Sequence, residues 1–192
     1  MKFLKNYDNP KNIRFKSFEF ALLEASRRNH KTLVETGVAR GKKKFIFFRK
    51  INWLDGMSTL IFSDYANFVN GHLYSCDIDN KNINSAKKFT KKNSNFITFM
   101  KDDSLNFLKN FEKKIDFLYL DSLDGQFPNA SEHQLNEIKL AINNLHEKSL
   151  VLLDDKGQKT KLSIEYMINN NFKIINETKQ QVLLSYRQNE AP

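Results

Sequence analysis

The stretch VETGVARG, which runs from Val34 to Gly41, decides the fold. An apolar run, Leu33-Val34, ends in Glu35 and is followed by two glycines four residues apart. This pattern indicates a buried strand that stops at a tight turn, where the backbone can approach a ligand closely. The residues that follow, KKKFIFFRKINWLDG (42–56), are basic and aromatic, and a helical pattern begins only at Met57–Phe68. We therefore interpret 42–56 as an insertion between the turn and its helix.

Strand and helix patterns alternate along the rest of the chain. The expected helices are Lys16–Asn29, Met57–Phe68, Lys81–Lys92, Asp103–Phe111, Ala130–Leu145 and Lys161–Asn169. The expected strands are Thr32–Glu35, His72–Cys76, Asn95–Met100, Ile115–Asp121 and Ser149–Asp155, followed by a hairpin over Phe172–Arg187 that turns near 177–179. This alternation predicts a parallel sheet with right-handed crossovers, to which the final hairpin adds an antiparallel strand.

Length and composition predict one domain over residues 1–192, with an N-terminal helical extension over 1–30. The single cysteine, Cys76, cannot form an internal disulfide, and no apolar run has transmembrane length. The first twelve residues carry charge but lack the apolar core of a signal peptide. We therefore expect a cytoplasmic protein that does not bind a membrane.

The chain is basic, with a formal net charge of +9 that comes from 31 lysine and arginine residues against 22 aspartate and glutamate residues. A nucleic-acid partner would explain such a charge. The lysines are scattered, however, and lysine, asparagine, isoleucine and phenylalanine are abundant together, as AT-rich codons would produce. We favour composition bias, because net charge alone does not identify a site.

Acidic residues follow each of the five expected parallel strands. These segments are Glu35-Thr36-Gly37, Asp77-Ile78-Asp79, Asp102-Asp103-Ser104, Asp121-Ser122-Leu123-Asp124 and Asp154-Asp155. The carboxyl ends of parallel strands lie at one edge of the sheet, where ligands bind. An acid after the second strand suits the paired hydroxyls of a ribose, and Asp103 with the Ser104 amide suits an adenine edge. The pattern predicts a cofactor that contains adenosine.

These segments resemble the class I S-adenosylmethionine-dependent methyltransferases. ETGVARG resembles their first motif, SCDID the ribose-binding end of strand two, and KDDSLNFL the adenine-binding segment. IDFLYLDSLDG and SLVLLDDKG resemble the fourth and fifth strands of the catechol O-methyltransferase-like branch. The resemblance covers Thr32 to Arg187. It implies a Rossmann-like, doubly wound α/β fold with a mostly parallel seven-stranded sheet and an antiparallel C-terminal hairpin strand.

The resemblance implies S-adenosylmethionine as the cofactor. The residues expected to contact it are Glu35, Thr36, Gly37, Gly41, Ser58, Asp77, Ile78, Asp103, Ser104 and Asp121. The branch also implies a divalent ion such as Mg²⁺, with Asp121, Asp154 and Asp155 as ligands, although Asp154-Asp155 can equally begin a loop and cap a helix.

Asp121, Asp124 and His133 are the candidate catalytic residues. Asp124 stands where the branch often has a lysine that acts as general base, and this difference disfavours catechol-type chemistry. His133 follows the fourth strand and is either a general base or a surface histidine.

The expected activity is methyl transfer to a small acceptor, most simply at oxygen and with a metal assisting. Residues 42–56 are expected to form a lid, with Phe45, Phe47, Phe48 and Trp53 as an apolar wall and the cations facing an anionic acceptor. The same residues could instead hold nucleic acid, or the aromatics could serve only as core anchors. A cofactor-binding module without catalysis is a further alternative. A nicotinamide dehydrogenase would need G-x-G-x-x-G, which this turn lacks.

Overall fold

Seven strands form one sheet in the order β5-β4-β1-β6-β7-β9-β8 in the computed structural model, which describes residues 1–45 and 48–187. The parallel strands are β1 (Thr32–Thr36), β4 (His72–Asp77), β5 (Ile97–Lys101), β6 (Phe117–Leu120) and β7 (Leu150–Leu153). The last strand, β9 (Val182–Tyr186), is antiparallel to both β7 and β8 (Phe172–Glu177). The predicted fold class is therefore confirmed.

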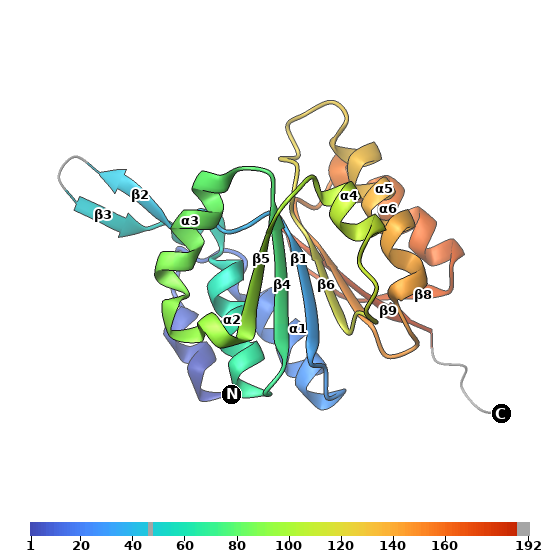
Figure 1. Ribbon diagram of the computed structural model, residues 1–192. Coiled ribbons are helices and arrows are strands. Elements are labelled where there is room, and N and C mark those ends of the chain that lie inside the picture. The colour runs from blue at the N-terminus through green and yellow to red at the C-terminus, as the bar shows by residue number, and fades with distance from the viewer. Residues whose placement is uncertain (46–47, 188–192) are drawn as a thin grey trace.

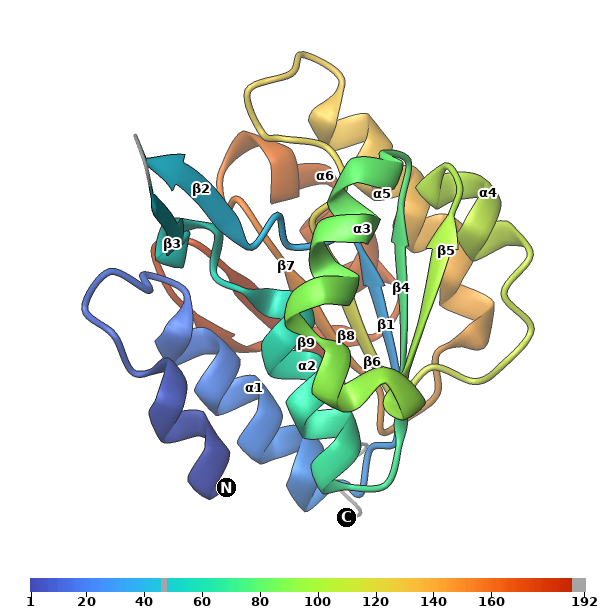
Figure 2. The same ribbon diagram turned by 60° about the vertical axis from the view of Figure 1, so that its left-hand side comes forward.

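Helices cover both faces of this sheet (Figures 1 and 2). One face carries α1 (Phe15–Arg27), α2 (Ser58–Phe68) and α3 (Asn80–Phe89), and the other carries α4 (Ser104–Lys109), α5 (Ala130–Ala141) and α6 (Gln158–Asn169). Each face has its own apolar core, and the side chains of β6 and β7 are buried along the whole of both strands. This is why both strands read as apolar on two faces in the sequence.

The short 3₁₀ helices were not predicted from the sequence. They are η1 (Lys2–Tyr7), η2 (Trp53–Asp55), η3 (Lys91–Phe96) and η4 (Ile142–Asn144). The first of them holds the N-terminal extension on α2, because the Tyr7 hydroxyl donates to Asp64 Oδ2 at 2.6 Å. Within residues 1–45 and 48–187, no helix has the length and apolar character needed to span a membrane.

The insertion forms a β-hairpin that projects from the body of the protein (Figures 1 and 2). Its strands β2 (Lys42–Phe45) and β3 (Phe48–Ile51) are antiparallel, and the Asn52 amide donates to the Gly41 carbonyl at the base at 2.8 Å. Trp53 is half-buried and packs against the core beneath α1 and α2. Phe47, one of the expected wall residues, lies outside the described residues.

The glycine turn after β1 passes unusually close to the end of β6. Gly37 has a φ of +84°, and a Cβ atom there would lie 2.1 Å from the backbone oxygen of Asp121. Its amide donates to the Cys76 carbonyl at 2.9 Å, which joins the turn to β4 as well. Gly41 also has a left-handed φ, and a Cβ atom there would overlap the ring of Phe89. Both glycines are therefore required by local geometry.

We expect Gly37→Ala to lower the free energy of unfolding by about 2 kcal/mol or more, because a left-handed φ and a backbone overlap are both penalised. Thermal unfolding measures the change. Gly125→Ala is the matched control, since its Cβ atom would come no closer than 3.3 Å to a side-chain atom of Asp155. Equal melting temperatures for the two variants would contradict the requirement at Gly37.

Candidate active site

Two cavities lie at the carboxyl ends of the strands. The smaller has a volume of about 150 Å³ and the larger about 530 Å³. Consecutive residues at the end of β6 separate them: Asp121 lines the larger cavity, and Ser122 lines the smaller. This is the edge at which ligands bind in open parallel sheets.

The smaller cavity brings together five of the residues predicted to contact a cofactor. They are Gly37, Asp77, Ile78, Asp103 and Ser104. The Asp77 carboxylate accepts hydrogen bonds from the amides of Val38, at 3.1 Å, and Asp79, at 2.7 Å, so its position at the end of β4 is fixed. An oriented carboxylate beside a glycine turn is suited to the hydroxyls of a ribose.

His133 lies at the smaller cavity and not among the residues that line the larger one. Its Nε2 atom is 3.0 Å from Ser104 Oγ and 3.0 Å from Ser122 Oγ. Neighbours on two strand ends therefore hold the imidazole. A catalytic role for His133 stays a prediction, and the structure places its imidazole beside two hydroxyls at the smaller cavity.

Four other residues predicted to contact a cofactor line neither cavity: Glu35, Thr36, Gly41 and Ser58. Glu35 is 0% exposed, and its two carboxylate oxygens accept hydrogen bonds from Ser58 Oγ and Ser75 Oγ, each at 2.6 Å. Burial raises the pKa of Glu35 to about 7. Glu35 thus supports the strand beneath the glycine turn, because serines from α2 and β4 point at it from both sides.

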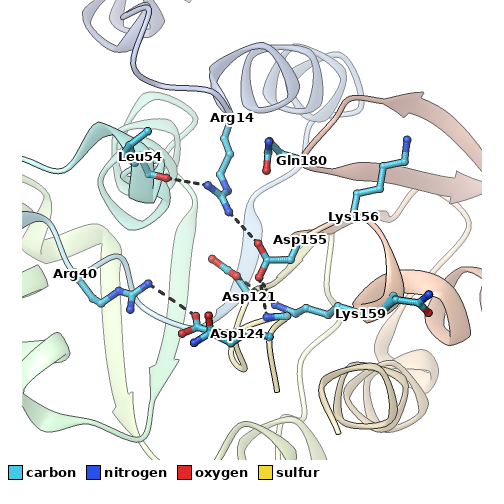
Figure 3. A pocket seen from close by; sticks show the side chains of 12 residues that line it. Arg14, Arg40, Leu54, Asp121, Asp124, Asp155, Lys156, Lys159 and Gln180 are labelled. Atoms are coloured by element: carbon cyan, nitrogen blue, oxygen red, sulfur yellow. Dashed lines mark hydrogen bonds and ion pairs between the residues drawn. The ribbon is translucent and has the colours of Figure 1, made fainter. Parts of the chain in front are cut away.

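A closed ring of side chains lies at the larger cavity, and Figure 3 shows the four members that line it: Arg14, Asp121, Asp155 and Lys159. Its contacts join, in order, Asp154, Arg14, Asp155, Lys159, Asp121, Tyr119 and Gln181, and Gln181 returns to Asp154. The three aspartates come from the ends of β6 and β7, and the two cations come from α6 and the residue that precedes α1. Every strand-end acid in the ring is therefore bonded to a cation.

Arg14 neutralises the most deeply buried of these acids. Its Nε and Nη2 atoms lie 2.7 Å from Asp154 Oδ1 and Oδ2 respectively, and Gln181 Nε2 donates to the same Oδ1 at 2.7 Å. Asp154 is 0% exposed, so a fork of two charge-assisted hydrogen bonds offsets the cost of its burial.

Lys159 joins the other two acids. Its Nζ atom is 3.4 Å from Asp121 Oδ1 and 3.4 Å from Asp155 Oδ2. Burial and the neighbouring Asp154 raise the pKa of Asp121 well above its usual value, although Lys159 opposes the shift. Asp124, the third candidate catalytic residue, lines the same cavity and pairs at 3.9 Å with Arg40.

The predicted metal ligands do converge, because one oxygen from each of Asp121, Asp154 and Asp155 lies within 4.8 Å of the others. They do not fit a divalent cation as they are arranged. Both oxygens of Asp154 already accept from Arg14, and Lys159 bridges the remaining pair. A cation would have to displace one of these positive groups.

Sequence reasoning missed Arg14, Lys159 and Gln181. Arg14 and Asp154 are 140 residues apart, and Gln181 lies in the terminal hairpin, so no local pattern connects them. Lys159 did carry a signal, since it follows Asp155 by four residues at the start of a helix, a spacing that pairs opposite charges.

Comparisons with known proteins agree with this geometry. A family model described as "Methyltransferase domain" matches residues 34–156. No sequence among the curated proteins matches the chain.

Three solved structures have a similar fold at 10–12% sequence identity. A methyltransferase of Podospora anserina with bound S-adenosylhomocysteine has 12% identity and a TM-score of 0.66, over 97% of this chain and 86% of that one. An rRNA methylase of Streptococcus thermophilus has 12% identity and a TM-score of 0.65, over 94% and 99%. A precorrin-6y C5,15-methyltransferase of Geobacter metallireducens has 10% identity and a TM-score of 0.63, over 90% and 88%.

Glu35 should make stability depend on pH. Its folded-state pKa of about 7 lies above the ordinary value of 4.5, so the wild type loses stability as pH rises through this interval. We expect Glu35→Gln to match the wild type near pH 4 and to exceed its free energy of unfolding by about 3 kcal/mol near pH 8. Denaturant unfolding at both pH values tests this, with the exposed Glu112→Gln as control. A constant difference between Glu35→Gln and the wild type would contradict the assignment.

Proposed function

The chain belongs to the methyltransferase-domain family and is an S-adenosylmethionine-dependent transferase, and from this premise we propose that it methylates a hydroxyl oxygen of a small, polar acceptor. The smaller cavity takes the adenosine part of the cofactor, and the larger cavity takes the acceptor. We also propose that residues 1–192 work as one catalytic domain, because Arg14 of the N-terminal extension contacts Asp154 and Asp155 inside the site.

The position of Asp121 carries this proposal. Its carboxylate lines the larger cavity, while its backbone lies against Gly37, which lines the smaller one. The two cavities therefore meet at Asp121, and a carboxylate there is within reach of an acceptor placed next to the cofactor. Its side chain keeps 26% of its surface exposed, so it is accessible from the cavity.

When bound, S-adenosylmethionine would supply an electrophilic methyl group, and transfer would exchange its carbon–sulfur bond for a carbon–oxygen bond to the acceptor. Asp121 accepts the proton that the hydroxyl loses. Arg14 and Lys159 hold the carboxylates in place, and the protein otherwise contributes alignment and the exclusion of water.

The lining of the larger cavity favours a polar acceptor. Charged groups of both signs line it, among them Arg40, Asp124, Lys156 and Lys159, and Leu54 is the one apolar side chain among the described lining residues. An acceptor rich in hydroxyls, with or without an anionic group, matches such a surface better than a flat aromatic ring does. Placement in the catechol O-methyltransferase-like branch and assistance by Mg²⁺ remain predictions, and no step of this mechanism requires them.

Two variants separate cofactor binding from chemistry. Asp121→Asn should keep the affinity for S-adenosylhomocysteine in calorimetry and reduce turnover about a hundredfold or more, because the amide cannot accept the proton. Asp77→Ala should weaken that affinity about tenfold, through the loss of hydrogen bonds to a charged group. The proposal fails if Asp121→Asn turns over a hydroxyl acceptor at the wild-type rate.

Nucleic acid is the second candidate for the acceptor, because the register of the hairpin places basic residues opposite one another. Lys43 stands opposite Lys50, and Lys44 stands opposite Arg49. Like charges directly opposite on paired strands destabilise a hairpin, so an anionic partner would stabilise this one. Either the phosphates of a nucleic acid or one anionic group on a small acceptor could serve.

Replacement of Lys42, Lys43 and Lys44 by alanine distinguishes the two acceptors. For a small acceptor we expect cofactor affinity to be kept, turnover to fall strongly, and the salt dependence of acceptor binding to be shallow. A nucleic-acid acceptor would instead bind the wild type with an affinity that falls steeply with salt, and the triple variant would lose that binding. If the triple variant keeps both turnover and affinity, the hairpin is only a structural extension.

A further inference from the structure

We propose that the ammonium group of Lys159, supported by Arg14, takes the place of a divalent cation among Asp121, Asp154 and Asp155, so that methyl transfer needs no metal. The catalytic part of this inference rests on the proposed function, whereas the exclusion of metal does not.

The first argument is position. Lys159 Nζ bridges one oxygen of Asp121 and one of Asp155 at 3.4 Å each, as a bridging cation would. The lysine side chain is 2% exposed, so its charge is held among the carboxylates rather than extended into water. A lysine is seldom buried unless such partners are present.

The second argument is that both carboxylate oxygens of Asp154 already accept hydrogen bonds from other side chains. Asp154 Oδ1 accepts from Arg14 Nε and Gln181 Nε2, each at 2.7 Å, and Oδ2 accepts from Arg14 Nη2 at 2.7 Å. Arg14 Nη2 also reaches Asp155 Oδ1 at 3.1 Å. A divalent ion among these oxygens would lie within a few ångströms of two positive groups, and that repulsion would be strong in a buried site.

The third argument is charge. Three carboxylates would repel one another if they were brought together without compensation. Arg14 and Lys159 contribute two positive charges, so the cluster carries at most one net negative charge. Arg14 and Lys159 therefore already provide the positive charge that a metal ion would otherwise provide.

Lys159 would also donate a hydrogen bond to the acceptor. An ammonium group has three N–H donors, of which Asp121 and Asp155 use two. Lys159 lines the larger cavity, so the third donor can reach the acceptor oxygen. It would stabilise the negative charge that develops there as the hydroxyl proton passes to Asp121.

Binding of Mn²⁺ tests the exclusion of metal without any need for turnover. Titration of Mn²⁺ followed by electron paramagnetic resonance should show no saturable site in the wild type or in Lys161→Met, an exposed lysine on the same helix. Lys159→Met should show a saturable Mn²⁺ site that the wild type lacks, since a neutral side chain of similar length removes the competing charge. Circular dichroism establishes that each variant is folded.

Two results would overturn the inference. One is a Mn²⁺ site in the wild type that Asp155→Asn abolishes, because the triad would then hold metal despite Lys159. The other is a folded Lys159→Met that binds no Mn²⁺, because Lys159 would then not occupy the position of a cation. If Lys159→Met does not fold, the wild-type titration alone decides between exclusion and binding.

Turnover gives an independent test. Wild-type protein treated with EDTA should keep its full rate, and Lys159→Met should lose activity that Mn²⁺ partly restores. Loss of wild-type activity in EDTA with recovery in Mn²⁺ would overturn the inference. If no hydroxyl acceptor is methylated by any form of the protein, the proposed function fails, and the Mn²⁺ titration still decides whether Lys159 excludes metal.

Discussion

The buried pair of Arg14 and Asp154 is the interaction on which the candidate active site depends. The parallel sheet brings three aspartates to adjacent strand ends, and carboxylates this close are unstable together unless positive charge is supplied. Arg14 supplies it through two contacts of 2.7 Å to a carboxylate that is 0% exposed. Removing one partner of such a pair typically costs about 3–5 kcal/mol, because the other charge stays buried.

The same arginine connects parts of the chain that are distant in sequence. Its Nη1 atom donates to the Leu54 carbonyl at 2.8 Å, at the base of the hairpin insertion. A Cβ atom on Gly56 would come within 3.0 Å of Arg14 Cδ, so the insertion also packs against the arginine stem. The N-terminal extension and the insertion thus meet at the rim of the larger cavity. The N-terminal extension supplies Arg14 to the charge balance of the site. The same arginine also contacts the insertion at Leu54 and Gly56.

The sequence was sufficient to predict the fold and five of the residues that line the smaller cavity. Both predictions follow from periodicity and from the rule that parallel strands end at one edge of the sheet. It could not show which way a strand-end side chain points. Glu35 points inward to Ser58 and Ser75, which belong to other elements and have no local relation to it. Arg14 and Gln181 reach Asp154 only through the completed fold, so the sequence shows three aspartates as candidate metal ligands without the side chains that contact them.

The fold alone does not determine the acceptor. The three similar structures include proteins named for rRNA and for a precorrin, so this sheet carries methyltransferases for chemically unrelated acceptors. In this chain, the parts that would distinguish acceptors are the polar lining of the larger cavity and the basic hairpin beside it. The hairpin lies outside the seven-stranded sheet, and Arg40, Leu54 and Lys156 of the lining lie in segments between its strands. The ring of paired charges is different, because its three aspartates follow β6 and β7 directly and its position is therefore set by the sheet.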